Sequence, residues 1–294
     1  MTPPFERFLG VDWSGAKSED EPVMLAIAEA VRGGAPELVA PPQPRAVRTR
    51  KWSRAQARAL LEQRLAVDQP RTLVAIDMAV GLPWGSDRAL FGVRGWRALV
   101  DAMAAEHARA NDHGIVGSAR STGERINARF PDGAPFRTDA TRNDGRFYRD
   151  HRVAYYRQVE SLVPQAISPW YLGSGGKVGD HTISGMFTLS RLLAARDRGA
   201  LAFHVWPHEG LALPADGHVL VECYPAAMGA KLRGVEAGTT GDERDALGIV
   251  AWLLDRDRDG LLAASFELDE VGFGRVDGVS WREQLEFEGW IFGM

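Results

Sequence analysis

Short apolar runs that end in an acidic residue recur along the chain. Three of them lead into Asp12, Asp77 and Glu222, and the first breaks into Ser-Gly directly after Trp13. A continuous apolar run of this length, bounded by turn-forming residues, is typical of a buried strand. The pattern therefore predicts three buried strands that each carry a carboxylate at or near the end.

The positions between these runs predict the other elements of an α/β fold. Further strands are expected at residues 23–31, at 37–40 or 45–52, and at 202–206. Helices are expected at residues 54–67 (capped by Ser53), 94–111, 185–198 and 242–256. Three antiparallel strands followed by a helix and another strand indicate a mixed sheet with a right-handed crossover.

The region from residue 84 to residue 185 has a looser pattern and a different charge. Residues 88–157 contain thirteen arginines and eight acidic residues, whereas the whole chain has a net charge of −4. A long polar span inside a compact domain is uncommon unless it has a function. We therefore interpret residues 84–185 as a partly irregular, arginine-rich insertion after the fourth strand, between core parts at residues 1–83 and 186–294.

Four basic residues of this region are candidates for contact with substrate phosphates. They are Arg137, Arg142, Arg146 and Lys177. Arginine binds phosphate through a planar fork of donors, and lysine does so as a point charge. A solvated arginine-rich loop and a surface lysine explain the same residues equally well, and the pattern alone does not decide between these interpretations.

Composition is that of a soluble globular protein. The 294 residues are 45% hydrophobic and 25% charged, and no uninterrupted apolar stretch reaches about 18 residues. Because the start of the chain also lacks the pattern of a signal peptide, we expect a cytoplasmic protein without a membrane partner. Cys223 is the single cysteine, which excludes an internal disulfide and is typical of a small buried strand residue. A pI of about 6.0 gives no general attraction to nucleic acid, and nothing in the pattern indicates an oligomeric state.

Two further acids stand at the start of the helix expected at residues 242–256. Asp242 and Asp245 are three positions apart, so both can point to one side of the first turn. Acids at a helix start also compensate the helix dipole, which is the alternative explanation. Because three strands end in carboxylates as well, we favour a shared site for a divalent cation. Carboxylate oxygens bind hard cations, and the cation charge offsets the repulsion among the acids.

The order of several short motifs resembles an uncharacterised bacterial and archaeal family described as predicted ribonuclease-H-like nucleases (domain of unknown function 429). The motifs are Gly10-Val11-Asp12, Ala75-Ile76-Asp77 with Gly81-Leu82-Pro83, Gly176-Lys177-Val178-Gly179 leading to Gly185, Val221-Glu222-Cys223-Tyr224-Pro225, Asp242-x-x-Asp245-Ala246-Leu247, and Glu288-Gly289-Trp290-Ile291. The resemblance spans nearly the whole chain, and it lies in the order of the motifs rather than in any one of them.

The resemblance implies a ribonuclease H-like fold, a mixed five-stranded sheet flanked by helices, and phosphodiester cleavage with two Mg²⁺ or Mn²⁺ ions. By position, Asp12 is expected to bridge the ions, with Asp77 and Glu222 completing the shell. Asp245, with Asp242 as its partner, is expected to hold the second ion. A slip of one residue along its strand would turn Glu222 to the other face of the sheet, so this ligand depends most on the register.

Three hypotheses for function follow. The first is a metal-dependent nuclease or phosphodiesterase whose substrate is nucleic acid or a small phosphodiester. The second is a protein of the same fold that binds a phosphorylated small molecule or a nucleotide, because actin-like ATPases also begin with a glycine-flanked Asp strand. The sequence has neither a second phosphate loop nor an adenosine-binding glycine pair, which disfavours it. The third is a non-catalytic protein that retains the acidic centre.

Overall fold

The computed structural model describes residues 4–42, 51–109, 118–141, 144–163, 166–173, 178–228, 240–270 and 276–294. The strands are β1 (Arg7–Asp12), β2 (Ala26–Val31), β3 (Glu37–Leu38), β4 (Thr72–Ile76), β5 (Phe203–Trp206) and β6 (His218–Glu222). They form one mixed sheet of six strands in the order β3-β2-β1-β4-β6-β5. The predicted α/β class and mixed sheet are confirmed. The five strands implied by the family resemblance are one too few, whereas the strands predicted from the apolar runs, including the one at residues 202–206 (β5), number six.

The strand directions bring four strand ends to the same edge of the sheet. β1 pairs antiparallel with β2, which pairs antiparallel with β3. β1 also pairs parallel with β4, and β6 lies parallel between β4 and β5. The carboxyl ends of β1, β4, β6 and β5 therefore share one edge, which is where open α/β sheets bind their ligands.

The other regular elements of the described chain are helical. They are α1 (Arg54–Arg64), α2 (Ser86–Phe91), α3 (Trp96–Ala108), α4 (Ala119–Asn127), α5 (Arg146–Asp150), α6 (Gln158–Leu162), α7 (Val178–Asp197), α8 (Pro225–Met228), α9 (Gly241–Arg258) and α10 (Trp281–Glu288), with 3₁₀ turns at Asp139–Thr141 and Ala263–Phe266. Ser53 caps α1 as predicted, since its side chain accepts from the backbone N–H of Gln56.

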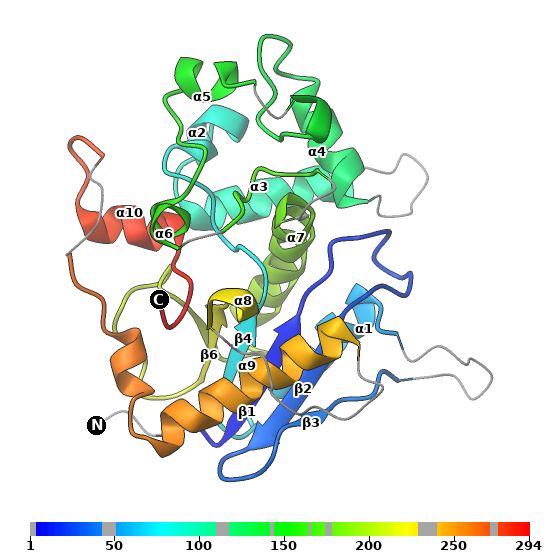
Figure 1. The fold of residues 1–294 in the computed structure, drawn as a ribbon, viewed down its shortest axis with the longest axis vertical. Helices are drawn as coiled ribbons and strands as arrows, with labels where there is room; N and C mark the ends of the chain where they lie inside the picture. The colour runs from blue at the N-terminus through cyan, green and yellow to red at the C-terminus, as the bar shows by residue number, and fades with distance from the viewer. Residues whose placement is uncertain are drawn as a thin grey trace.

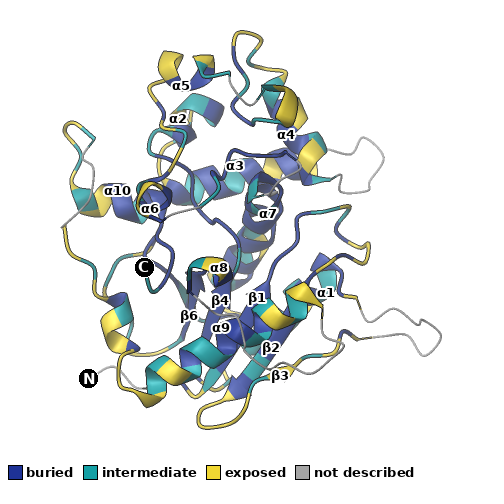
Figure 2. Ribbon diagram, in the orientation of Figure 1, coloured by how far each residue is buried: buried dark blue, intermediate teal, exposed yellow. Residues whose placement is uncertain are grey.

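Helices cover both faces of the sheet, because alternate strand residues point to opposite sides. On one face, Val11 and Ile76 join an apolar cluster that includes residues of α1, α3 and α7. On the other face, Phe8 and Ala75 join a cluster with Ile249 of α9. Figure 1 shows α9 lying across β1 and β2, and Figure 2 shows the strands of the sheet largely buried between the helical layers.

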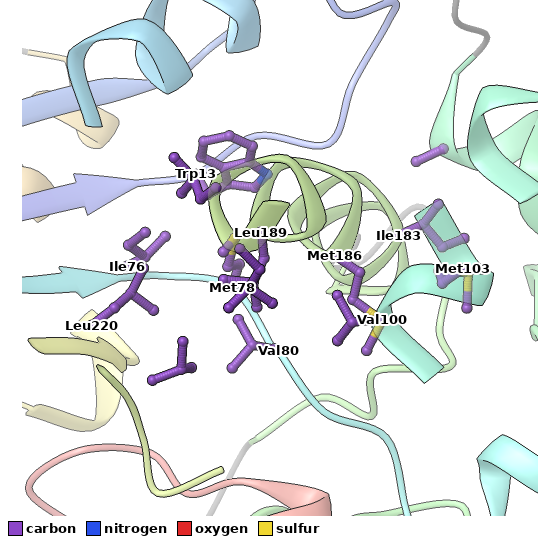
Figure 3. Packing of buried hydrophobic residues seen from close by; sticks show 14 of the residues in the cluster. Trp13, Ile76, Met78, Val80, Val100, Met103, Ile183, Met186, Leu189 and Leu220 are labelled. Carbon is purple, nitrogen blue, oxygen red and sulfur yellow. The ribbon is translucent and has the colours of Figure 1, made fainter. Parts of the chain in front are cut away.

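The region from residue 84 to residue 185 shares the main core of the molecule. Figure 3 shows how the core runs from the sheet side to the helices of this region. It labels side chains from the strands and the segments after them (Trp13, Ile76, Met78, Val80, Leu220), from α7 (Ile183, Met186, Leu189) and from α3 (Val100, Met103), all of which are buried in one cluster. The described part of this region is thus built of short helices packed on the core.

One predicted helix boundary is wrong. The helix expected to begin at residue 185 begins at Val178, so the expected boundary between insertion and core falls inside α7. Its first turns are Gly, Asp, His and Thr, a polar run that resembles a loop. Close packing explains this composition, because a Cβ atom on Gly179 would lie 2.8 Å from the carbonyl oxygen of Tyr171. Within the described ranges, no helix combines the length and apolar character that a membrane span needs.

Candidate functional site

Asp12 and Asp77 lie side by side at the carboxyl edge of the sheet. Val11 of β1 is in register with Ile76 of β4. The ladder continues one step further, since the backbone N–H of Asp77 donates to the carbonyl oxygen of Val11 at 2.9 Å. The next pair across these strands is therefore Asp12 and Asp77, and both side chains point to the face covered by α9.

Gly10 allows α9 to approach this edge closely. A Cβ atom at Gly10 would lie 2.6 Å from the carbonyl oxygen of Ala246 and 3.0 Å from the Cβ of Ile249, so only glycine fits here without a shift. Asp242 stands one turn before Ala246, which brings it toward the end of β1. Its side chain shares a hydrogen bond with that of Asp12. The close contact between β1 and α9 therefore brings Asp12 near the acids at the start of α9.

The four aspartates Asp12, Asp77, Asp242 and Asp245 form one electrostatic cluster, called here the aspartate cluster. Burial and the negative charges of the other three members raise the pKa of Asp12 to about 9. Burial, with the charges of Asp245 and of Glu222, raises the pKa of Asp77 to about 8. Desolvation and like charges both oppose ionisation of a carboxyl group. In the absence of a cation, Asp12 and Asp77 therefore hold protons near neutral pH.

The aspartate cluster fits a hard divalent cation in its donor chemistry and in its charge. Carboxylate oxygens are the preferred ligands of Mg²⁺ and Mn²⁺, and a bound cation reverses the electrostatics that raise these pKa values. The side chains do not form a closed ligand shell, however. Among the described residues, no group of three or more His, Cys, Asp or Glu side chains is arranged to hold a metal ion.

The structure places Glu222 differently from the predicted metal shell. Its carboxylate accepts from both terminal nitrogens of the Arg157 guanidinium, with 2.7 Å between Nη1 and Oε2, and also from the backbone N–H of Val80 at 3.3 Å. Register explains the difference. Ile76 is level with Glu222, so the residue level with Asp77 on the same face is Cys223.

Arg157 is the centre of a buried ion-pair network. Its guanidinium donates to Glu160, to Glu222 and to the backbone carbonyl of Glu288. These bonds engage all five N–H donors of the side chain, which is 1% exposed. The carboxylate of Glu288 in turn accepts from the backbone N–H of Gln158 and of Trp84. Arg157 therefore ties α6 to β6 and to the end of α10, and it has no donor left for a substrate.

The sequence analysis predicted Cys223 to be a buried strand residue but did not assign it to this site. It is buried, as expected for a strand cysteine. Burial, together with Asp77 and other nearby carboxylates, raises its pKa well above the ordinary value, so the thiol stays protonated in the metal-free protein. One indication of this was present in the sequence. Cys223 directly follows Glu222, so the two side chains lie on opposite faces of the sheet, and a register shifted by one residue puts Cys223 in the place expected for Glu222.

A pocket of about 190 Å³ adjoins the aspartate cluster. Asp77, Cys223, His181 and Arg157 with its two glutamates are among the residues that line it. The remaining wall includes small and apolar side chains and the partly exposed ring of Tyr224. The site therefore has two parts, an acidic cluster and a small pocket beside it.

Only two of the four predicted phosphate-binding residues, Arg137 and Arg146, lie in the described parts of the chain. Arg142 and Lys177 lie outside the described residues. The guanidinium of Arg137 stacks on two tyrosine rings, 4.4 Å from the centroid of Tyr148 and 4.2 Å from that of Tyr155. Arg146 pairs with Asp144 in its own loop, at 3.0 Å. Both described arginines thus make contacts within the helical region itself, Arg137 with aromatic rings and Arg146 in an exposed ion pair.

Comparison of the chain with models of known families, with curated proteins and with solved structures gives no match. The resemblance to ribonuclease-H-like nucleases therefore stays a prediction. The geometry of the aspartate cluster and of the adjoining pocket is what bears on function.

Proposed function

We propose that the chain is a divalent-metal-dependent phosphodiesterase that acts on nucleic acid, with the aspartate cluster as its metal-binding site. The observation that carries this proposal is the level placement of Asp12 and Asp77 beneath the first turn of α9. Four acids from the ends of two strands and from a helix converge there, although the charges of the other three oppose ionisation of Asp12 and the charge of Asp245 opposes that of Asp77. Such a convergence is unfavourable for stability, and clusters of this kind are typical of functional sites.

The sheet topology supports the proposal. The central strand β1 carries Asp12 and lies between an antiparallel hairpin partner, β2, and the parallel strand β4 that leads into Asp77. This mixed arrangement is compatible with a ribonuclease H-like fold. The acids stand at the carboxyl edge, where a long polymer can reach them from outside the sheet.

The residues of the cluster have different parts in the proposed reaction. Bound Mg²⁺ or Mn²⁺ supplies a water of lowered pKa and offsets the charge on the scissile phosphate. The charges of the other three aspartates all act on the carboxyl group of Asp12. Asp12 is therefore the candidate for contact with more than one ion. Asp77, directly after β4, and Asp242 and Asp245 of α9 would complete the set of residues that hold the ion. In this proposal Glu222 leaves the ligand set and instead fixes Arg157.

The test is a cleavage assay with Mg²⁺ or Mn²⁺ over single-stranded, duplex, hybrid and branched nucleic acids. We expect the parent to cut at least one substrate and Asp12→Asn to lose at least about 100-fold in rate, since the substitution removes one ligand charge. Asp68→Asn is the matched control, because Asp68 is exposed and precedes the start of β4, at the opposite edge of the sheet.

Equal rates for the parent and Asp12→Asn would contradict the proposed site. A chain that binds Mn²⁺ through Asp12 and cuts none of these substrates would contradict the proposed reaction. That second result would favour the nucleotide-binding or non-catalytic hypotheses.

A further inference from the structure

The pocket beside Asp77 has a chemistry unlike that of the aspartate cluster. Its one described arginine, Arg157, has every donor engaged, and three carboxylates, those of Asp77, Glu160 and Glu222, line the same space together with the imidazole of His181. An anionic group entering this pocket would meet negative charge without an available described guanidinium donor. The described lining therefore favours an uncharged group over a phosphate, although the pocket adjoins the place where the scissile phosphate is proposed to bind.

The rest of the pocket suits a flat, uncharged group. Ala79, Ala166, Ile167 and Val178 contribute small or apolar surfaces. The ring of Tyr224 also lines the pocket and is only partly buried, so one of its faces or edges can meet a ligand. Tyrosine rings stack on nucleobases, whatever the base, because every base has a π-face.

The size of the pocket limits what can enter. At about 190 Å³ it is smaller than the roughly 300–1,000 Å³ of sites that take drug-sized ligands. A single ring system fits in such a space, whereas a base pair does not. A base can reach it only when it is unpaired or turned out of the helix.

We infer that this pocket is a subsite for one unpaired nucleobase of the substrate, next to the phosphodiester held at the aspartate cluster. The inference rests on the proposed function, and it names the substrate class. The base contacts the ring of Tyr224 and the apolar side chains of Ala166 and Ile167, while the charged backbone stays at the aspartate cluster. The substrate is then single-stranded nucleic acid or an unpaired end or branch, and continuous duplex is disfavoured.

The test compares two ligands that share a phosphate and differ in the base. Adenosine 5′-monophosphate and ribose 5-phosphate are titrated calorimetrically into the protein with Mg²⁺ present. We expect the nucleotide to bind at least tenfold more tightly than the sugar phosphate. Tyr224→Ala is expected to weaken nucleotide binding by about 5- to 150-fold, the loss seen when one base-stacking ring is removed. Tyr224→Phe keeps the ring and is expected to restore most of the affinity.

A second variant changes the apolar part of the pocket lining. Ala166→Phe fills the space without disturbing a fully buried position, since Ala166 is partly exposed. It should abolish the preference for the nucleotide and leave ribose 5-phosphate binding unchanged. Ala105→Phe, on an exposed position of α3, is the matched control and should behave as the parent.

The outcomes separate this inference from the proposed function. Equal affinities for the two ligands, or an unchanged preference in Ala166→Phe, would overturn the base subsite even if Asp12-dependent cleavage is observed. Cleavage of uninterrupted duplex as fast as of the same single strand would overturn it too. A nucleotide preference that Ala166→Phe removes, in a protein that cuts nothing, would uphold the subsite and reject the nuclease.

Discussion

Two groups of buried carboxylates lie close together at the carboxyl edge of the sheet, and they differ in what surrounds them. In the ion-pair network, Glu160 and Glu222 enclose the guanidinium of Arg157. In the aspartate cluster, the charges that act on Asp12 are those of three other aspartates. The first group is paired with a cation inside the protein. In the second, like charges act on Asp12, and protons or a bound cation would relieve that repulsion.

The comparison indicates which acids the fold pairs internally and which are candidates for a functional role. A buried carboxylate that meets an arginine with good geometry is strongly held, and breaking the pair is costly. Carboxylates gathered against each other make the fold less stable and are retained where they bind something. Glu222 and Asp77 follow the same kind of apolar run in the sequence, yet the structure assigns them to different groups.

The largest expected effect is on the ion-pair network. Arg157→Met leaves Glu160 and Glu222 buried without their cation, and we expect it to lower the free energy of unfolding by about 3–5 kcal/mol. Denaturant unfolding at pH 7 measures the loss. Adding Glu222→Gln to this variant should recover part of the stability, because it removes one uncompensated charge. Arg146→Met breaks an exposed pair and should change little. A similar small effect for Arg157→Met would show that the network does not hold the region to the core.

The contact between β1 and α9 can be disturbed separately. Gly10→Ala forces a methyl group to within 2.6 Å of a backbone oxygen of α9, so the helix must move away from the strand. We expect a loss of about 1–3 kcal/mol in unfolding free energy and weaker Mn²⁺ binding, because the helix acids move with α9. Gly241→Ala has open space around it and should retain both properties. Unchanged metal affinity in Gly10→Ala would mean that α9 contributes no ligand.

A smaller effect is expected in the pH dependence of the metal-free protein. The raised pKa values of Asp12 and Asp77, about 9 and about 8 against 3.8 when exposed, mean that the folded state holds more protons than the unfolded state between about pH 4 and pH 9. Stability contributed by the protonated cluster is therefore present at low pH and lost as the pH rises through this window. Asp12→Asn should flatten this slope and stabilise the metal-free protein at pH 8 by on the order of 1 kcal/mol.

Thermal unfolding between pH 5 and pH 9 in the presence of a chelator measures this slope. Asp68→Asn should keep the slope of the parent. A parent whose stability rises steadily over this range would contradict the electrostatic description of the cluster.

The sequence was sufficient to predict the acids at the ends of β1 and β4 and at the start of α9. Their signals are local, an apolar run that ends at Asp12 or Asp77 and a helix that begins beside Asp242. The mixed sheet followed from the same runs. Such patterns depend only on residues that are close in the sequence, so they can be recognised without any knowledge of tertiary contacts.

The parts that escaped prediction depend on contacts between distant residues. Whether Glu222 or Cys223 lies level with Asp77 is set by the pairing of β6 with β4, which a single strand does not reveal. Arg157 is 65 positions from Glu222, so nothing local distinguished it from the other arginines of its region. The start of α7 was missed because its glycine and polar residues are selected by close packing.

The most direct test of the central claim is a calorimetric titration of Mn²⁺ into the parent, Asp12→Asn and Asp68→Asn at pH 8. If the aspartate cluster is a cation site, the parent and Asp68→Asn bind Mn²⁺ alike, and Asp12→Asn binds at least tenfold more weakly. Equal Mn²⁺ affinity in all three proteins would contradict the claim.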